Sequence, residues 1–357
     1  DKGVLKVSVD LSKSKLSPSD NVNAPDSGSL EKAPSNSSKQ NVSHTSFDNE
    51  ISRASKIYQN AKEAQNKVLQ KIKVGEPIDI ESVEQVSGGL LDSIQRNKDA
   101  LACLTRMHNT DDYLLEHSIN VAILMGVFAD YLELPKEQCH QLITGALLLD
   151  VGMIGVKHSI LSKTTKLSAG ELSAAKGHVE LGYKVLKKSK NLPELSLQIV
   201  LDHHERLDGS GYPNGKKAEE LDQFSRMVAI LDSYDAIVSN RPYRLAKTPI
   251  ASFKDLKNQS DKYDADLVNQ FIKCMGIHPV GSLVKLKSNK LGIVVHSNLK
   301  NPTAPVIKVF YSVTNKSYIP PKQVNLAAKN CTDEIVKSVM PEEFKLNILK
   351  FFKEVLL

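Results

Sequence analysis

The sequence predicts a mainly α-helical protein with a small β-module at its C-terminal end. From Asn49 to about Gly276, apolar residues recur every three or four positions, as they do in amphipathic helices. After His278 the pattern changes to the two-residue alternation that is typical of strands. Near the other end of the chain, residues 12–48 are rich in Ser, Asn, Asp and Pro and contain few large apolar side chains, so we expect a disordered linker there.

The helical region is predicted to begin with two long helices. The first carries a stripe of apolar residues from Ile51 to Val68, and Gly75-Glu76-Pro77 is expected to end it. The second extends over residues 78–107, with Gly88-Gly89 as the place where it can break. Ser168 and Glu171 have the spacing of a capping box at the start of a later helix. Helices are also predicted over residues 112–127, 142–151, 167–187, 194–204, 224–238 and 266–276.

Strands are predicted at both ends of the chain. Residues 4–9 alternate between apolar and polar side chains, which suits one short strand. In the C-terminal module, strands are predicted over residues 283–286, 291–296 and 306–311, followed by a terminal amphipathic helix over residues 342–355. The predicted division of the chain is a strand-containing segment at 1–11, the linker at 12–48, the helical domain at 49–277, and the β-module with its helix at 278–357.

The composition points to a cytoplasmic protein without a membrane span. The chain has 357 residues and a formal net charge of +6. Because its Lys and Arg residues are spread among acids, this charge weakly favours anionic partners and does not indicate DNA binding. The four cysteines, Cys103, Cys139, Cys274 and Cys331, form no CxxC pair, so we expect reduced thiols. No apolar run reaches the length of a membrane span, and no signal peptide is visible.

Residues 203–213, with the sequence HHERLDGSGYP, concentrate groups that carry chemistry. Imidazole and carboxylate side chains are common ligands of divalent metals. The glycines let the backbone turn sharply and approach a ligand closely, and a loop of this kind can present backbone N–H groups to an anion. Taken alone, an adjacent pair of histidines is equally compatible with a polar surface loop.

The same stretch resembles the HHExxDGxGYP signature of HD-GYP domains, which are all-helical members of the HD hydrolase superfamily. Every specified position of the signature is present, and the resemblance extends from about Asn49 to the C-terminus. It implies an HD-superfamily helical bundle in a bacterial signalling protein of the cyclic di-GMP system, the family's activity being hydrolysis of that nucleotide. It also implies that the strand at residues 4–9 is the last piece of a small β-rich domain, because such a domain often precedes the helical core.

The resemblance implies a cluster of metal ligands that are far apart in sequence. Considered alone, His117 on an apolar helix face is more often a packed core residue than a ligand. The mixed imidazole and carboxylate set accepts iron, manganese, nickel or zinc, with up to two ions bound. Asp235 and Glu205 are expected to support the ligands through hydrogen bonds. Through its matching positions the family pattern assigns metal ligation to His117, Asp150, His178, His203, His204 and Asp232, with Asp150 as the bridging, catalytic carboxylate.

Two residues depart from the family pattern, which is His-Asp followed by a hydrophobic residue and Gly-Lys. In this chain Leu149 replaces the histidine before Asp150, and Met153 replaces the lysine after Gly152. Leucine offers no lone pair to a metal, and methionine offers no cation to a phosphate. We therefore expect one of the two metal positions to be weakened, and the two losses together predict weak or absent turnover.

Residues near the ligands are implied to bind the nucleotide. In the family pattern the basic residues after the DxxDA motif contact phosphates, which assigns this role to Arg241 and Arg244. Bidentate contact between guanidinium and phosphate gives the physical reason. Gly211 and Tyr212 are assigned to the same nucleotide site. A solvated helix face is the alternative explanation for the two arginines.

These observations leave two hypotheses from different functional classes. In the favoured one, the protein is a cyclic di-GMP receptor or partner protein with weak or absent hydrolysis, because Leu149 and Met153 damage the site. In the other, it is an active metal-dependent phosphodiesterase, because six ligands and the whole GYP loop are retained. A scaffold that binds no nucleotide is a third option, against which Arg241 and Arg244 argue. A related cyclic dinucleotide, protein partners in the same signalling system and a homodimer stay open.

Overall fold

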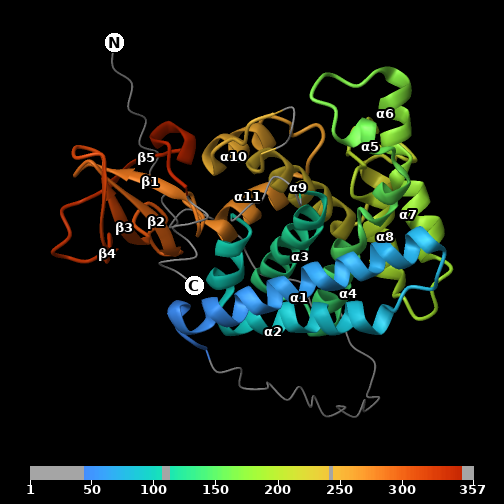
Figure 1. Cartoon of the computed structure of the whole chain (residues 1–357), viewed down its shortest axis with the longest axis horizontal. Helices are drawn as coiled ribbons and strands as arrows, with labels where there is room; N and C mark the ends of the chain where they lie inside the picture. The colour runs from blue at the N-terminus through green and yellow to red at the C-terminus, as the bar shows by residue number, and fades with distance from the viewer. Residues whose placement is uncertain (1–43, 107–112, 241–243, 348–357) are drawn as a thin grey trace, which may run out of the picture. The chain divides into compact units, whose positions relative to one another are not determined.

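The structure is a computed structural model that describes residues 44–106, 113–240 and 244–347. The predicted strand at residues 4–9, most of the predicted linker, Arg241 and the end of the predicted terminal helix lie outside these ranges. The predicted fold class is confirmed, since a helical region is followed by a five-stranded sheet (Figure 1).

The α-helices are α1 (Phe47–Val74), α2 (Ile80–Leu104), α3 (Tyr113–Tyr131), α4 (Lys136–Leu148), α5 (His158–Leu161), α6 (Ala169–Lys176), α7 (His178–Leu186), α8 (Glu194–Asp202), α9 (Gln223–Val238), α10 (Pro249–Lys257) and α11 (Ala265–Met275). Short 3₁₀-helices are η3 (Val151–Gly155), η4 (Ala218–Glu220) and η5 (Pro341–Phe344). The strands are β1 (Leu283–Leu286), β2 (Lys290–His296), β3 (Val306–Ser312), β4 (Ser317–Asn325) and β5 (Ile335–Ser338).

Helices α1 and α2 lie side by side (Figure 1). As predicted, α1 ends at Gly75, which adopts a left-handed conformation with φ of 75°. The predicted break of α2 at Gly88-Gly89 is wrong, because both glycines are helical and Gly89 faces Ile57 of α1. The helix is instead interrupted at Asn97, with φ −163° and ψ 98°. The Asn97 amide donates a hydrogen bond to the Thr45 carbonyl at 2.9 Å, so the kink ties α2 to the residues before α1.

Helix α3 lies at the centre of the hydrophobic core. From Ser118 to Ala129 every side chain is buried, and α1, α2, α4, α9 and α11 all pack against the helix. A helix that is apolar on all sides is stable in water only when it is surrounded in this way. His117, near the start of α3, is therefore held in the interior. Across the described ranges, no helix is both long and apolar enough to cross a membrane.

The segment after α4 packs unusually closely against α7. The predicted helix at 142–151 ends earlier, at Leu148, and continues after a turn as η3. The predicted helix at 167–187 is two helices, because the chain turns at Gly177; its capping box at Ser168 is present. A Cβ atom on Gly152 would overlap the carbonyl oxygen of His178 and lie 2.6 Å from the Gly182 nitrogen. Only glycine therefore lets η3 approach α7 so closely.

The C-terminal module is an antiparallel sheet with the strand order β4-β3-β2-β1-β5. Strands β1 to β3 correspond to the three predicted strands, whereas β4 and β5 were not predicted. The predicted terminal helix is wrong at its start, since η5 stops at Phe344 and Lys345 has a left-handed conformation. The module contacts the helical region through His296, whose Nδ1 lies 3.2 Å from Asp99 Oδ2 and whose ring meets the edge of Phe47.

The close packing at Gly152 leads to a stability prediction. We expect Gly152→Ala to lower the free energy of unfolding by about 3 kcal/mol, because its methyl group would force η3 away from α7. Gly170→Ala in α6 is the matched control, since nothing lies within 4 Å of its added Cβ, and it should change stability by less than about 1 kcal/mol. Urea denaturation followed by circular dichroism measures both. Equal stability of the two variants would contradict the packing argument.

Candidate metal centre

The structure brings the six predicted ligand residues together from five parts of the chain. His117 belongs to α3, and Asp150 lies in the turn between α4 and η3. His178 is the first residue of α7, while His203 and His204 follow directly after α8. Asp232, on α9, faces His117 with its Oδ1 3.0 Å from the His117 Nε2.

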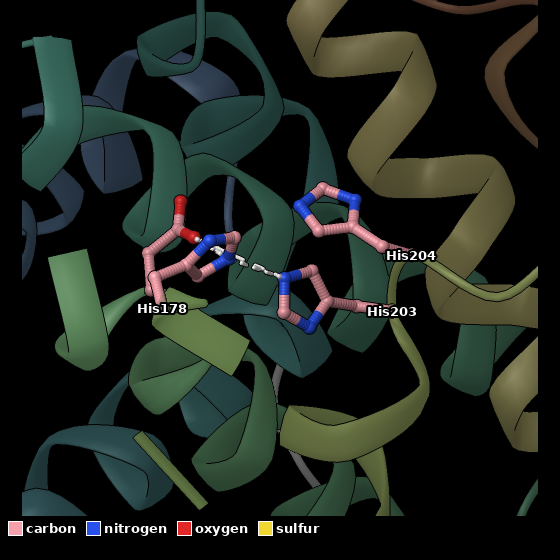
Figure 2. A group of neighbouring side chains, drawn as sticks. His178, His203 and His204 are labelled. Atoms are coloured by element: carbon pink, nitrogen blue, oxygen red, sulfur yellow. Dashed lines mark hydrogen bonds and ion pairs between the residues drawn. The ribbon is translucent and has the colours of Figure 1, made fainter. Parts of the chain in front are cut away.

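Four of these residues form the tightest group. Asp150, His178, His203 and His204 each offer one ligand atom, and these atoms all lie within 4.8 Å of one another. Figure 2 shows the three imidazoles gathered around a common space. The Nε2 atoms of His178 and His203 are only 3.3 Å apart, and His178 Nε2 is 3.1 Å from Asp150 Oδ1.

Backbone carbonyls fix the orientation of two of these imidazoles. His178 Nδ1 donates to the Ala175 carbonyl at 2.7 Å, and His203 Nδ1 donates to the Val200 carbonyl at 2.8 Å. Because a carbonyl oxygen can only accept, Nδ1 carries the proton in both rings. In the neutral rings the lone pair is then on Nε2, and both Nε2 atoms point into the group. This arrangement is suited to a shared cation.

A second group lies on the other side of Asp150. His117 Nε2 is 3.8 Å from Asp150 Oδ2 and 3.0 Å from Asp232 Oδ1. The opposite nitrogen, Nδ1, donates to Asp235 Oδ2 at 2.8 Å, so Asp235 orients the ring from behind. Asp232 also reaches the first group, because its Oδ2 is 3.3 Å from His204 Nδ1.

The carboxylate of Asp150 therefore lies between two sets of imidazoles. Its Oδ1 faces His178, and its Oδ2 faces His117. Oδ1 is buried 3.1 Å from His178 Nε2, and none of the described residues donates a hydrogen bond to it. A buried carboxylate oxygen without a hydrogen bond is costly unless a cation satisfies it. The donor set of three imidazoles and a carboxylate thus fits a divalent metal.

The electrostatics differ between the two sides of the centre. Although burial lowers it, hydrogen bonds to Asp232 and Asp235 raise the pKa of His117 to about 10. Burial and the neighbouring His204 imidazole hold the pKa of His203 well below its usual range. Burial opposes the ionisation of Asp150, but the adjacent His178 keeps its pKa below the ordinary value. The first group therefore offers an unprotonated imidazole at neutral pH, whereas His117 retains a proton in the metal-free protein.

The two substituted positions occupy different environments. Leu149 continues the helical backbone of α4, and its side chain is wholly buried in the hydrophobic core. Met153, in η3, is half-buried and lines the same cavity as Asp150. Of the two apolar side chains, only Met153 thus lines the cavity that Asp150 lines, whereas Leu149 belongs to the core.

The GYP loop is folded back onto the end of α8. The buried carboxylate of Glu205 accepts hydrogen bonds from three successive backbone N–H groups, at Asn214, Gly215 and Lys216. A Cβ on Gly211 would lie 2.5 Å from the Glu205 Cα, so glycine is needed there. This packing places the Tyr212 ring 4.6 Å from that of His204, between centroids. Tyr212 consequently forms one wall beside the imidazoles.

Sequence analysis did not single out Arg206, although it lies close to the centre. Its guanidinium donates to Ser233 Oγ at 3.1 Å, lies 3.9 Å from Asp232 Oδ2 and covers the ring of Tyr263. Arg206 occupies an unspecified position of the HHExxDGxGYP signature, so the motif carried no signal for it.

Arg244, by contrast, is exposed and donates to the Ala236 carbonyl at the end of α9. Arg241 is outside the described residues.

The raised pKa of His117 leads to a pH prediction for the metal-free protein. His117 binds its proton more tightly in the folded state than in the unfolded state. This proton therefore stabilises the folded protein fully below pH 6.5, and the stabilisation is lost as the pH rises towards about 10. Between about pH 6.5 and 8.5 we expect the free energy of unfolding to fall by about 2 kcal/mol. Urea denaturation of chelator-treated protein measures this. His117→Gln should flatten the profile, and an equally steep profile in that variant would contradict the assignment.

Family comparisons agree with this geometry. A family model described as an HD domain matches residues 97–267, which include all six predicted ligands. A second model, described as a domain of unknown function, matches residues 1–83 and so includes α1. An HDG"Y"P protein from Bdellovibrio bacteriovorus has a similar fold, with a TM-score of 0.53 and 19% identity over 66% of this chain and 73% of its own.

Two bacterial relatives are named for their enzymatic activity. A cyclic di-GMP phosphodiesterase of Pseudomonas aeruginosa is 33% identical over 290 residues, which are 81% of this chain and 70% of the relative. A cyclic di-GMP phosphodiesterase of Thermotoga maritima is 35% identical over 159 residues, or 44% of this chain and 43% of the relative. The HHExxDGxGYP signature is folded against a cluster of His and Asp residues, and the Pseudomonas relative is similar over most of both chains. The chain therefore belongs to the HD-GYP family of HD-domain proteins.

Proposed function

We propose that this protein binds cyclic di-GMP at the candidate metal centre and acts as a receptor or partner protein with weak or absent hydrolysis. The observation that carries the proposal is the inequality of the two sides of Asp150. On one side, three imidazoles and the carboxylate lie within 4.8 Å of one another. On the other side, His117 is accompanied by carboxylates, and the next position in sequence before Asp150 is a buried leucine.

The residues would divide into one complete metal position and one depleted position. Asp150, His178, His203 and His204 would hold the better-bound ion, while His117, Asp150 and Asp232 would hold the weaker one. A bound divalent metal would activate water and neutralise charge on the phosphoryl oxygens. The donor set is compatible with iron, manganese, nickel or zinc.

The protein's own groups would position the nucleotide at this centre. Arg241 and Arg244 are proposed to contact its phosphates, because guanidinium groups bind phosphate with two aligned hydrogen bonds. Gly211 lets the loop pack closely against Glu205, and Tyr212 presents an aromatic face next to His204. Glu205 holds this loop through three backbone N–H groups, so the loop is positioned before a ligand arrives. Asp235 keeps the His117 ring in one orientation.

An active phosphodiesterase is the second candidate function. It is favoured by the position of Asp150, whose two oxygens face the two sets of ligands as a bridging carboxylate requires. The names of the Pseudomonas and Thermotoga relatives favour it as well. Against it stands Met153, which supplies no positive charge to the cavity beside Asp150.

Metal analysis combined with nucleotide binding distinguishes the candidates. We expect elemental analysis of the purified protein to find about one tightly bound metal ion per chain, since one position has its full set of ligands. Calorimetry should show binding of cyclic di-GMP, and chromatography should show little linear product. Two fully occupied metal positions with rapid hydrolysis would favour the phosphodiesterase. A protein that neither binds nor cleaves the nucleotide would exclude both candidates.

Restoring the two missing groups tests whether they limit turnover. Leu149→His with Met153→Lys should increase cyclic di-GMP hydrolysis at least about tenfold, because one restored electrostatic donor is worth that much or more. The single change Leu149→His should raise metal content before it raises the rate, since it adds a ligand and no cation. Met153→Lys alone is the complementary control. If the parent protein already hydrolyses as fast as the double variant, the receptor hypothesis is wrong.

A further inference from the structure

A cavity of about 420 Å³ opens beside Asp150 and extends away from the imidazoles. Its walls come from α1, α3, η3 and α5, and most of its lining is apolar. Leu69, Leu115, Met153, Ile154 and Leu161 form much of this surface. The cavity therefore joins the charged end of the metal centre to a surface that suits the flat, weakly polar face of a nucleobase.

One cation lines this cavity. Helix α1 contributes Gln65, Leu69 and Lys73, which are spaced four residues apart and so lie on one face of the helix. Among the described residues that line the cavity, Lys73 is the only lysine or arginine. Lys73 is exposed, and none of the carboxylates in the described ranges lies within ion-pair distance of its ammonium group. The ammonium group is available to an anionic ligand.

We propose that Lys73 contacts a phosphate of the bound cyclic dinucleotide and that the apolar walls beside it receive one of the bases. This inference rests on the proposed function and adds a subsite to it. A phosphodiester that approaches Asp150 meets the charges of Asp150 and Asp232, which lie near each other across His117. A cation in the adjoining cavity offsets that repulsion. Met153 carries no charge and cannot offset the repulsion. Lys73, which lines the same cavity from α1, can.

The position of Lys73 is set by contacts that hold α1 to the core. Lys62 forms an ion pair with Glu116 of α3 at 3.1 Å, one residue before His117. The buried Gln65 amide donates to the Leu147 carbonyl near the end of α4, three residues before Asp150. These contacts come from the same helix, α1, whose last turn contains Lys73. The region matched as a domain of unknown function, residues 1–83, thus supplies one wall of the nucleotide site.

Charge removal at Lys73 tests the subsite. Calorimetric titration of the metal-loaded full chain with cyclic di-GMP should show Lys73→Gln binding at least about tenfold more weakly, because a charge-assisted phosphate contact is lost. Lys73→Arg should stay within about threefold of the parent, since it keeps the charge. The control is Lys67→Gln, because Lys67 is on the same helix but faces a different hollow, next to α2. It should bind as the parent does, with the same metal content and helicity in all variants.

A rescue variant separates a phosphate contact from a structural effect. In Lys73→Gln with Met153→Lys, a cation enters the same cavity from η3, and binding should recover by about tenfold relative to Lys73→Gln alone. If the parent binds cyclic di-GMP and Lys73→Gln binds equally well, this inference is wrong while the proposed function stands. If Lys73→Gln and Lys67→Gln weaken binding to the same degree, a contact specific to Lys73 is excluded. If the parent does not bind the nucleotide, the proposed function fails and this inference fails with it.

Discussion

The buried carboxylate of Asp150 is the constraint around which the helical domain is built. A carboxylate taken out of water loses its hydration and must be compensated inside the protein. Here the compensation comes from His178 on one side and His117 on the other. These two residues are 61 positions apart in sequence and belong to different helices, α7 and α3. The two helices, together with α4, α8 and α9, must therefore keep a fixed arrangement around one turn of chain. The geometry of the candidate metal centre and the packing of the helices around it therefore depend on each other.

Close backbone packing provides the accuracy that such an arrangement needs. Gly152 allows η3 to touch the first turn of α7, and this contact sets the distance between Asp150 and His178. At the end of α8, the buried Asp202 accepts from Lys216 Nζ at 2.7 Å and from Ser225 Oγ at 2.9 Å. Glu205 binds the adjacent backbone. Two buried carboxylates thus fasten the loop that follows the histidine pair, so His203 and His204 are held from both directions.

The fold class and the ligand cluster followed from the sequence because their signals are strong. Apolar periodicity marks each long helix. The HHExxDGxGYP signature contains His203 and His204, and the wider family pattern assigns the other four candidate ligands through resemblance. Weak signals account for what was missed. Strand β4 has the sequence SYIPPKQVN, whose two prolines argue against a strand, yet it lies at a sheet edge where prolines are tolerated. Helix α10 is short and begins with Pro249, although Thr248 caps it. At Asn97, the kink depends on a contact with Thr45, which no local pattern reveals.

Boundaries inside the site region depend on tertiary contacts as well. The helix expected over 167–187 is divided at Gly177, so that His178 begins a new helix and can bond to the Ala175 carbonyl behind it. The capping box at Ser168 marks the start of the first helix, but it does not mark this division, which lies nine residues later at Gly177. Arg206 was missed for a different reason. Its significance comes from Ser233 and Asp232, which approach it only when α9 packs beside the loop.

Leu149 stands where the family pattern has a histidine, and its side chain is part of the packed core. Leucine fills a fully buried position at the end of α4 and adds to the core. Although burial lowers it, hydrogen bonds to Asp232 and Asp235 raise the pKa of His117 to about 10. A proton on His117 and a metal ion beside it are therefore alternative ways to offset the same negative charge. On the other side, burial lowers the pKa of both His203 and His204. Burial also opposes protonation of His178, but the adjacent Asp150 raises the pKa of that imidazole. In the metal-free protein each side of Asp150 thus has one imidazole whose pKa is raised, His117 or His178, and only the His178 side adds two whose pKa is lowered.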